Sequence, residues 1–267
     1  MSNAALPHRP DFIDLDWRGR LLRLELAWVG AAASKHPMVV FLHEGLGSVA
    51  LWKDFPERFC RTHGFTGLVF SRYGYGRSSP RPLDEPLPPD FMEQQAWEVL
   101  PLLFSKLGLE RPWLLGHSDG ASIALLHATR FSERISGAVV MAPHVMVEPI
   151  SVESIAAARA AYVEGALRER LARYHADVDS AFWGWNTIWL DPAFRDWDMC
   201  ALLPSIRAPV LAIQGEGDEY GTLDQVHAIG RLVPHAEVLV LPDCGHSPYR
   251  DQPGRVIEAA GAFILAH

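Results

Sequence analysis

A serine between two glycines has the surroundings that nucleophilic chemistry requires. Residues 116–120 read G-H-S-D-G, with an apolar run at 113–115 before them and small residues opening a helix-like stretch after them. A G-x-S-x-G turn between a strand and a helix lifts the serine oxygen clear of its neighbours. Glycines suit both ends of the turn, because the chain bends tightly there and packs closely on adjacent elements. The pattern predicts Ser118 as a nucleophile.

A serine hydroxyl needs a base to take its proton and a third group to orient that base. Two later turns supply these residue types, and each follows a predicted strand. Residues 214–221 carry Asp218, and residues 242–248 carry His246. Because the carboxyl ends of parallel strands meet at one edge of a sheet, we expect both turns to lie near the serine. We predict His246 as the general base and Asp218 as the orienting acid, with Glu216 and Glu219 of the same turn as alternatives to Asp218.

Short apolar runs alternate with helix-like stretches along most of the chain. Continuous apolar strands are typical of sheets covered on both faces, and their alternation with helices predicts a parallel sheet. An alternating pattern around a glycine turn at 12–29 predicts a hairpin at the start. The other predicted strands span residues 38–42, 66–70, 113–115, 135–141, 209–213 and 238–241, and a closing helix spans 253–266.

This alternation stops between residues 143 and 200. Residues 151–174 are rich in Ala, Glu and Arg, which predicts one helix. We interpret the region as a helical cap inserted in the sheet domain. The predicted division is 1–143 for the first part of the core, 144–200 for the cap and 201–267 for the second part of the core.

Three tryptophans gather within the cap, at Trp183, Trp185 and Trp189. Ligand pockets are lined mostly by apolar and aromatic side chains, so these rings are candidates for an acyl or alcohol pocket. They are equally compatible with the core of a small insertion, and both interpretations stay open. Tyr220, beside the predicted acid, is a candidate for the edge of the same pocket.

The G-H-S-D-G turn, the Gly217–Asp218 pair and the C-G-H-S-P run at 244–248 together resemble the α/β-hydrolase superfamily. The resemblance extends from about residue 11 to the last residue. Within the superfamily the chain looks most like small serine hydrolases and esterases, including valacyclovir hydrolase-like and carboxylesterase-like enzymes. The resemblance implies the α/β-hydrolase fold, a mostly parallel sheet flanked by helices with an inserted helical cap. It also implies an acyl-enzyme route, in which Ser118 attacks a carbonyl and His246 protonates the leaving alcohol before water releases the acid.

The superfamily further implies two backbone N–H donors for the oxyanion formed during the reaction. One belongs to Asp119, the residue after the nucleophile. The other comes from the glycine-rich loop at residues 43–48, from Gly45 or Leu46 depending on the alignment. Glu44 stands where relatives carry the glycine of a His-Gly pair, and its role is left open.

The Asp119 side chain has two interpretations of its own. In valacyclovir hydrolase-like enzymes an aspartate after the nucleophile binds a substrate amino group. We favour the alternative, in which the Asp119 carboxylate caps the following helix, as Asp readily does.

Composition narrows the classes of partner. The chain has 267 residues, of which 49% are hydrophobic, enough for a substantial core. A net charge of −8 lacks the signature of nucleic-acid or anionic-membrane binding. No apolar run is long enough to cross a bilayer, and the first 30 residues lack the apolar centre of a signal peptide. Three widely spaced cysteines predict reduced thiols in a cytoplasmic protein.

We predict neither a metal nor an organic cofactor. None of the 12 histidines stands at a ligand spacing with Cys, Asp or Glu. The G-x-G triplets at 74–76 and 215–217 lack the third glycine of a dinucleotide loop. The expected partner is a small-molecule ester or acyl substrate, with no nucleic acid and no membrane, bound by a monomer or homodimer.

The sequence therefore predicts a cofactor-independent serine hydrolase that cleaves a small carboxylic ester. A thioesterase, a lactonase or a C–C bond hydrolase would use the same triad. A ligand-binding member of the fold is the alternative from a different class, since a fold does not determine a function.

Overall fold

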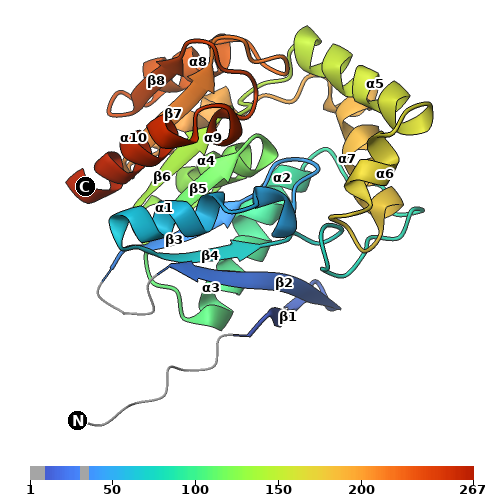
Figure 1. Cartoon of the computed structure of the whole chain (residues 1–267), viewed down its shortest axis with the longest axis horizontal. Helices are drawn as coiled ribbons and strands as arrows, with labels where there is room; N and C mark the ends of the chain where they lie inside the picture. Colours follow the sequence, from blue (N-terminus) through green and yellow to red (C-terminus); the bar gives the residue numbers. More distant parts are fainter. Residues whose placement is uncertain (1–9, 31–35) are drawn as a thin grey trace.

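One twisted sheet runs through the protein, seen here in a computed structural model that describes residues 10–30 and 36–267 (Figure 1). Over these residues the strand order is β1-β2-β4-β3-β5-β6-β7-β8. The β1–β2 and β2–β4 pairs are antiparallel and all other neighbouring pairs are parallel. The strands are β1 (Phe12–Trp17), β2 (Arg20–Gly30), β3 (Met38–Leu42), β4 (Thr66–Phe70), β5 (Trp113–His117), β6 (Gly137–Met141), β7 (Val210–Gly215) and β8 (Glu237–Leu241).

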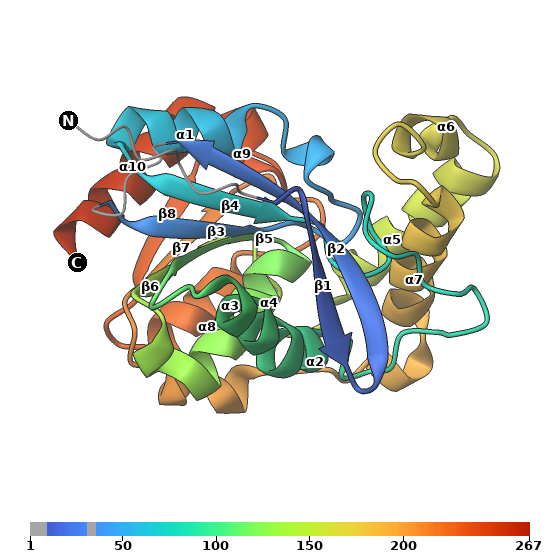
Figure 2. The ribbon, with the colours of Figure 1, turned by 90° about the horizontal axis from the view of Figure 1, so that it is seen from below.

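Helices cover both faces of this sheet (Figure 2). On one face lie α1 (Phe55–His63), α9 (Pro248–Asp251) and α10 (Pro253–Ala266). On the other lie α2 (Phe91–Gln94), α3 (Leu100–Leu107), α4 (Asp119–Phe131) and α8 (Asp224–Leu232), with the π-helical turn η2 (Gln95–Val99) joining α2 to α3. Short 3-10 turns are η1 (Ala50–Trp52), η3 (Ser132–Arg134), η4 (Pro192–Phe194) and η5 (Cys200–Ser205). The mostly parallel sheet flanked by helices that the sequence predicted is confirmed.

The apolar core forms two layers, one on each face of the sheet. Every residue of β4, β5 and β6 is buried, which explains their unbroken apolar character. Full burial of a Leu or Val side chain contributes roughly 1.5–3 kcal/mol to folding. The central strands are therefore the most firmly held part of the chain, and the Ser118 turn follows directly from β5.

Between β6 and β7 the chain leaves the sheet and forms three further helices at one side of the molecule (Figures 1 and 2). These are α5 (Pro149–Val163), α6 (Leu167–Leu171) and α7 (Val178–Leu190). We call residues 144–200 the cap segment. The single helix predicted over residues 151–174 is wrong: the helix breaks after Val163, and Gly165, a residue of low helix propensity, lies in the break.

The two passages of chain that connect the cap segment to the core pair with each other. Met146 and Asp198 form an antiparallel bridge, and the Val147 N–H donates to the Trp197 carbonyl at 3.1 Å. The cap segment therefore begins and ends at one place beside the sheet.

No helix among the described residues is long and apolar enough to cross a membrane. The expectation that no signal peptide is present falls partly on residues 1–9, which lie outside the described residues. Cys60, Cys200 and Cys244 are free thiols. Burial raises their pKa values, to about 12 for Cys60 and to about 11 for the other two, so that little reactive thiolate forms at neutral pH.

The two glycines of the G-H-S-D-G turn have no room for a side chain. A Cβ atom on Gly116 would lie 2.4 Å from the Gly120 carbonyl oxygen, and one on Gly120 would lie 2.1 Å from the Leu42 carbonyl oxygen. Both obstacles are backbone atoms, which cannot rotate away. The glycines therefore let α4 begin directly against β3 and β5.

We expect Gly120→Ala to lower the free energy of unfolding by roughly 1–3 kcal/mol, because the methyl group must displace backbone. Gly184→Ala is the matched control, since a Cβ there meets only Leu87 Cδ1 at 4.0 Å and the site is inside α7. Alanine favours a helix over glycine, so this control should hold or gain stability. Urea unfolding of both variants measures the difference, and equal midpoints would refute the packing argument.

Candidate active site

Ser118 occupies a strained turn between β5 and α4. Its backbone has φ 52° and ψ −123°, a conformation that residues with a side chain seldom adopt. Neighbouring groups hold it there: the Ser118 N–H donates to the Met141 carbonyl at 2.9 Å, and the Ser118 carbonyl accepts from the Ala121 and Ser122 N–H groups at 2.8 and 3.0 Å. The serine is thereby presented at the carboxyl end of the central strand.

Ser118, His246 and Asp218 form a continuous series of hydrogen bonds. His246 Nε2 lies 3.0 Å from Ser118 Oγ, and His246 Nδ1 lies 2.8 Å from Asp218 Oδ1. The three residues follow β5, β8 and β7 respectively, so the sheet brings together side chains that are far apart in sequence. Because a carboxylate can only accept, Nδ1 carries the ring hydrogen and Nε2 is free to accept the serine proton.

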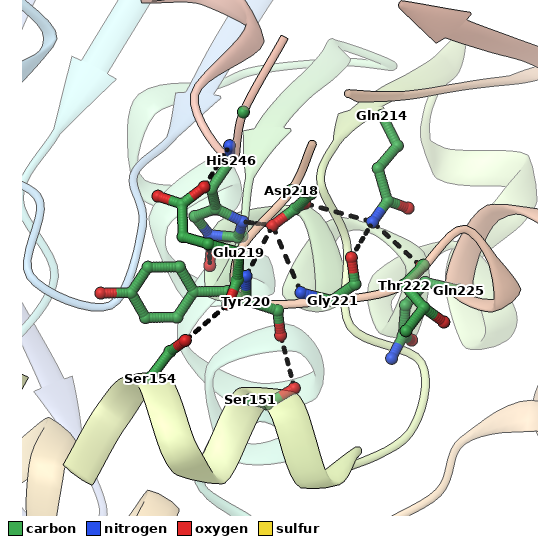
Figure 3. Close-up of polar contacts among 12 residues, drawn as sticks. Ser151, Ser154, Gln214, Asp218, Glu219, Tyr220, Gly221, Thr222, Gln225 and His246 are labelled. Carbon is green, nitrogen blue, oxygen red and sulfur yellow. Dashed lines mark hydrogen bonds and ion pairs between the residues drawn. The ribbon is translucent and has the colours of Figure 1, made fainter. Parts of the chain in front are cut away.

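Several groups hold the Asp218 carboxylate in this orientation (Figure 3). Oδ1 also accepts from the N–H groups of Tyr220 at 2.9 Å and Gly221 at 3.2 Å, and Oδ2 accepts from Gln214 Nε2 at 3.1 Å. Among the acids of this turn within the described residues, only Asp218 contacts the His246 ring. Glu219 accepts instead from the His246 backbone N–H at 3.1 Å, and Glu216 is exposed.

The cap segment supports the same turn from outside the sheet. Ser151 and Ser154 of α5 donate their hydroxyl groups to the carbonyls of Tyr220 at 2.6 Å and Glu219 at 2.5 Å (Figure 3). The position of the Asp218 turn thus depends on both the core and the cap segment.

Opposing effects determine the charge of the pair. Burial alone would lower the pKa of His246, but the hydrogen bond and negative charge of Asp218, together with Glu44 and Glu219, raise it. Burial alone would raise the pKa of Asp218, but the hydrogen bond and charge of His246 bring it below its usual value. A proton taken up by His246 is therefore stabilised beside an ionised Asp218.

Both loop residues predicted as oxyanion donors lie at the site. Gly45 and Leu46 line the same cavity as Ser118, and no described residue accepts a hydrogen bond from either N–H. The Asp119 N–H is the first of α4 and has no partner within the helix. A Cβ on Gly45 would lie 2.1 Å from Trp185 Nε1, so the loop passes directly beneath this cap ring.

A buried arginine, which the sequence interpretation missed, supports this loop. The Arg72 guanidinium donates to the carbonyls of His43 and of Glu44, the latter at 2.9 Å. The Arg72 N–H donates to His43 Nε2 at 3.0 Å. Burial and the nearby Arg72 charge hold the pKa of His43 well below its usual value, which keeps the ring neutral and able to accept.

The Asp119 carboxylate does not cap α4, contrary to the interpretation we favoured. It is buried with 1% exposure, lines the cavity beside Ser118, and neither oxygen has a hydrogen-bond partner among the described residues. Burial raises its pKa to about 6, against the lowering effects of Arg72 and the Trp189 indole. The prediction of a capping role fails because Ser118 occupies the N-cap position and Asp119 already lies in the first turn of α4.

These groups surround a cavity of about 720 Å³ that extends from Ser118 to the surface between the core and the cap segment. Trp185, Trp189 and Tyr220 line it, as predicted for pocket residues. Trp183 does not, and its ring packs edge-on against Phe182. Trp185 and Trp189 are four residues apart and share a face of α7, whereas Trp183 lies on another.

The described residues contain no group of three or more His, Cys, Asp or Glu side chains arranged to hold a metal ion.

Comparison with known proteins identifies the family. The model of the alpha/beta hydrolase family matches residues 39–259. The chain belongs to the alpha/beta hydrolase family. It is 24% identical over 262 positions to an sn-1-specific diacylglycerol lipase from Mus musculus, covering 85% of this chain and 81% of the lipase. It is also 24% identical over 280 positions to a proline iminopeptidase from Levilactobacillus brevis, covering 90% and 92% of the two chains.

Solved structures show the same alpha/beta hydrolase fold. A thermophilic esterase from Thermogutta terrifontis has a TM-score of 0.74 and 19% identity, over 96% of this chain and 99% of the esterase. An enol-lactonase from Burkholderia xenovorans has a TM-score of 0.72 and 18% identity, over 95% and 100% of the two chains. The predicted α/β-hydrolase fold is confirmed, and the family is one of hydrolases acting on several kinds of bond.

Glu44, whose role the sequence left open, contacts His117, the residue before Ser118. Glu44 Oε2 lies 2.7 Å from His117 Nδ1, although not aligned as a hydrogen bond, and Oε1 lies 3.6 Å from Arg250. Burial alone would raise the pKa of Glu44, but His117 and Arg250 lower it to about 2. The Glu44 carboxylate is therefore ionised.

The other nitrogen of His117 contacts the loop that carries the predicted base. His117 Nε2 lies 2.7 Å from the His246 carbonyl oxygen. The two ring nitrogens of His117 thus face oxygen atoms of two different loops. Glu44 and His117 together tie the glycine-rich loop, the Ser118 turn and the His246 loop to one another.

Asp218→Asn tests the pair of His246 and Asp218. We expect kcat to fall by roughly 10³–10⁴, because the histidine loses its orienting acceptor. The raised pKa of His246 places the acid limb of activity above pH 6.5, and removal of the charge should move that limb to lower pH. The pH profile of kcat/KM checks both effects. Glu216→Gln, at the exposed acid of the same turn, is the control, and a limb that stays in place in Asp218→Asn would contradict this assignment.

Glu44→Gln tests the second pair. It keeps the shape of the side chain but removes a charge that raises the pKa of His246, so the acid limb should again move to lower pH. We expect kcat to fall about tenfold with a smaller change in KM, because the His246 loop loses a positioning contact rather than a substrate contact. Asp54→Asn removes an exposed acid from the same cavity and serves as the control. An unshifted profile in Glu44→Gln would leave Glu44 with a purely structural role.

Proposed function

We propose that the chain is a serine hydrolase that cleaves small carboxylic esters, with Ser118, His246 and Asp218 as its triad. The observation that carries the proposal is the series of hydrogen bonds from Ser118 Oγ through His246 to Asp218, at the inner end of a cavity large enough for a substrate. Membership of a hydrolase family supports it.

In the proposed mechanism Ser118 Oγ attacks the ester carbonyl while His246 Nε2 takes the serine proton. The ionised Asp218 stabilises the imidazolium that results. The tetrahedral intermediate collapses, the C–O bond to the alcohol breaks, and His246 donates its proton to the departing oxygen. Water then attacks the acyl-enzyme, giving its proton to His246, and the acid leaves as Ser118 regains its hydrogen.

The oxyanion of both intermediates would be stabilised by the Asp119 N–H and by the N–H of Gly45 or Leu46. Donors of this kind lower the barrier by roughly 3–4 kcal/mol each in comparable sites. The acyl or alcohol group would lie against Trp185 and Trp189. His144, which also lines the cavity, packs edge-on against Trp189 with 4.9 Å between ring centroids.

Thioesters and lactones would pass through the same steps, and a C–C bond hydrolase would use the same triad. We also propose a cytoplasmic location, supported by the three free thiols, of which Cys60 and Cys244 are buried. The unpartnered Asp119 carboxylate beside Ser118 favours substrates that bring a hydrogen-bond donor or a positive charge close to the reacting carbonyl.

Activation of Ser118 is tested by labelling the folded protein with a fluorophosphonate. Labelling should occur in the native chain and be lost in Ser118→Ala. Ser247→Ala, at a serine of the same cavity without a base, should still be labelled. An unlabelled native protein would favour a ligand-binding role for the fold.

Substrate size is tested with p-nitrophenyl esters from acetate to dodecanoate, with Ser118→Ala as the blank. We expect kcat/KM to be highest for the short acyl chains, because the bulky rings of Trp185, Trp189 and His144 line the cavity together with Ser118. Turnover that persists in Ser118→Ala would rule out the proposed mechanism. A labelled protein that hydrolyses none of these esters would point to thioesters, lactones or ring-cleavage products.

A further inference from the structure

The cavity has two ends of different character. Its inner end is formed by buried residues, among them Ser118 and Trp189. Its outer end carries five exposed basic side chains from three parts of the chain, which are Lys53, Arg58, Arg170, Arg173 and Arg250. Glu44, Asp54 and Glu219 also line the cavity, and Arg250 lies 3.6 Å from Glu44. The basic side chains without an acidic partner among the described residues are therefore Lys53, Arg170 and Arg173.

Two of these basic side chains have no hydrogen-bond or ion-pair partner within the part of the chain that the structure describes. Arg170 and Arg173, at and just after the end of α6, make no side-chain hydrogen bond or ion pair with any described residue. Arg168 on the same helix behaves differently, because it pairs with Asp179 at 2.6 Å and does not line the cavity. Among the arginines of α6 and the turn that follows it, the one outside the cavity is therefore paired and the two at the cavity have no ion-pair partner among the described residues.

The opposite side of the opening adds further positive charge. Lys53 Nζ donates to the Tyr174 hydroxyl at 2.6 Å, which joins the segment before α1 to the segment after α6. This contact leaves the lysine charge uncompensated. Arg58 has only a loose contact of 3.7 Å with the exposed Asp54, which offsets part of its charge. Lysine and arginine thus face the opening from both the core and the cap segment.

Uncompensated like charges at one opening repel each other, and the repulsion is relieved when an anion binds between them. Guanidinium groups in particular bind phosphate and carboxylate oxygens through paired N–H donors. A short ester held at Ser118 would leave much of the 720 Å³ cavity unfilled. A substrate with an arm reaching the opening would fill it.

We propose that the physiological substrate carries an anionic arm, bearing phosphate or carboxylate groups, that extends from the reacting bond to Arg170 and Arg173. The inference rests on the proposed hydrolase function and adds a substrate class to it. Hydrolysis of such an ester or thioester consumes one water, and the arm leaves with the alcohol or thiol or remains with the acid.

The test compares matched charged and neutral substrates. Butyryl-coenzyme A is paired with S-butyryl-N-acetylcysteamine, which has the same thioester without phosphates, and 4-carboxy-2-nitrophenyl butyrate is paired with p-nitrophenyl butyrate. For the native chain, kcat/KM should be higher for the charged member of at least one pair, and the pair that responds identifies the anion. In Arg170→Gln/Arg173→Gln the ratio of charged to neutral kcat/KM should fall roughly tenfold, as expected for two partly exposed ion pairs.

Arg168→Gln is the control, since it removes one charge from α6 outside the cavity and should preserve the ratio. Raising the salt to about 1 M should also narrow the preference, because exposed charges are then screened within about 3 Å. Equal ratios in the native chain and the double variant would overturn the proposal.

A binding measurement tests the anionic arm even if the protein does not hydrolyse any of these substrates. If no substrate is turned over, free coenzyme A and 4-hydroxy-3-nitrobenzoate, the groups that the two charged substrates would release, are titrated by calorimetry into the native chain and into Arg170→Gln/Arg173→Gln. Weaker binding of either compound to the double variant supports the anionic arm without any turnover, and equal affinity or no binding for both compounds refutes it.

Discussion

The turn at Ser118 is the constraint on which the rest of the site depends. A positive φ at a residue with a side chain persists only where the surrounding structure enforces it. Here Met141 accepts the Ser118 N–H, and α4 can start against the sheet only because Gly116 and Gly120 lack side chains. Because β5 lies between parallel strands on both sides, Ser118 stands where the backbone has least freedom to move.

Buried charge around this turn is arranged in compensated pairs. Asp218 faces His246 and Glu44 faces His117, so each ionised carboxylate has a partner that offsets its loss of water. Asp119 is the exception, with both oxygens unpartnered among the described residues. Asp218 and Glu44, which hold loops in place, thus have histidine partners, whereas Asp119 beside Ser118 has no hydrogen-bond partner among the described residues.

Features that depend on a short stretch of sequence could be predicted, whereas contacts between distant segments could not. Ser118 and the apolar strands could be predicted, because a glycine-flanked turn and a buried strand have short-range signatures. The place of Asp218 and His246 followed from the rule that parallel strands end at one edge. The contact of Glu44 with His117, the support from Arg72 and the place of Asp119 in the cavity lining could not be predicted, since each depends on segments that only folding brings together. The tryptophans could be predicted only in part. Trp185 and Trp189 lie on one face of α7 and Trp183 lies on another, which can be seen only when the helix is known.

The pairing of Met146 with Asp198 has a consequence for how such a protein can diversify. Because the chain leaves and rejoins the core at one point, β6 and β7 remain neighbours whatever lies between them. Insertions, deletions or exchange of the intervening helices would leave the sheet register and the nucleophile turn intact. The limit on such exchange is the contact of α5 with the Asp218 turn, which any replacement segment would have to reproduce. In proteins whose cap segment is joined to the core in this way, substrate range can therefore evolve faster than the reaction chemistry.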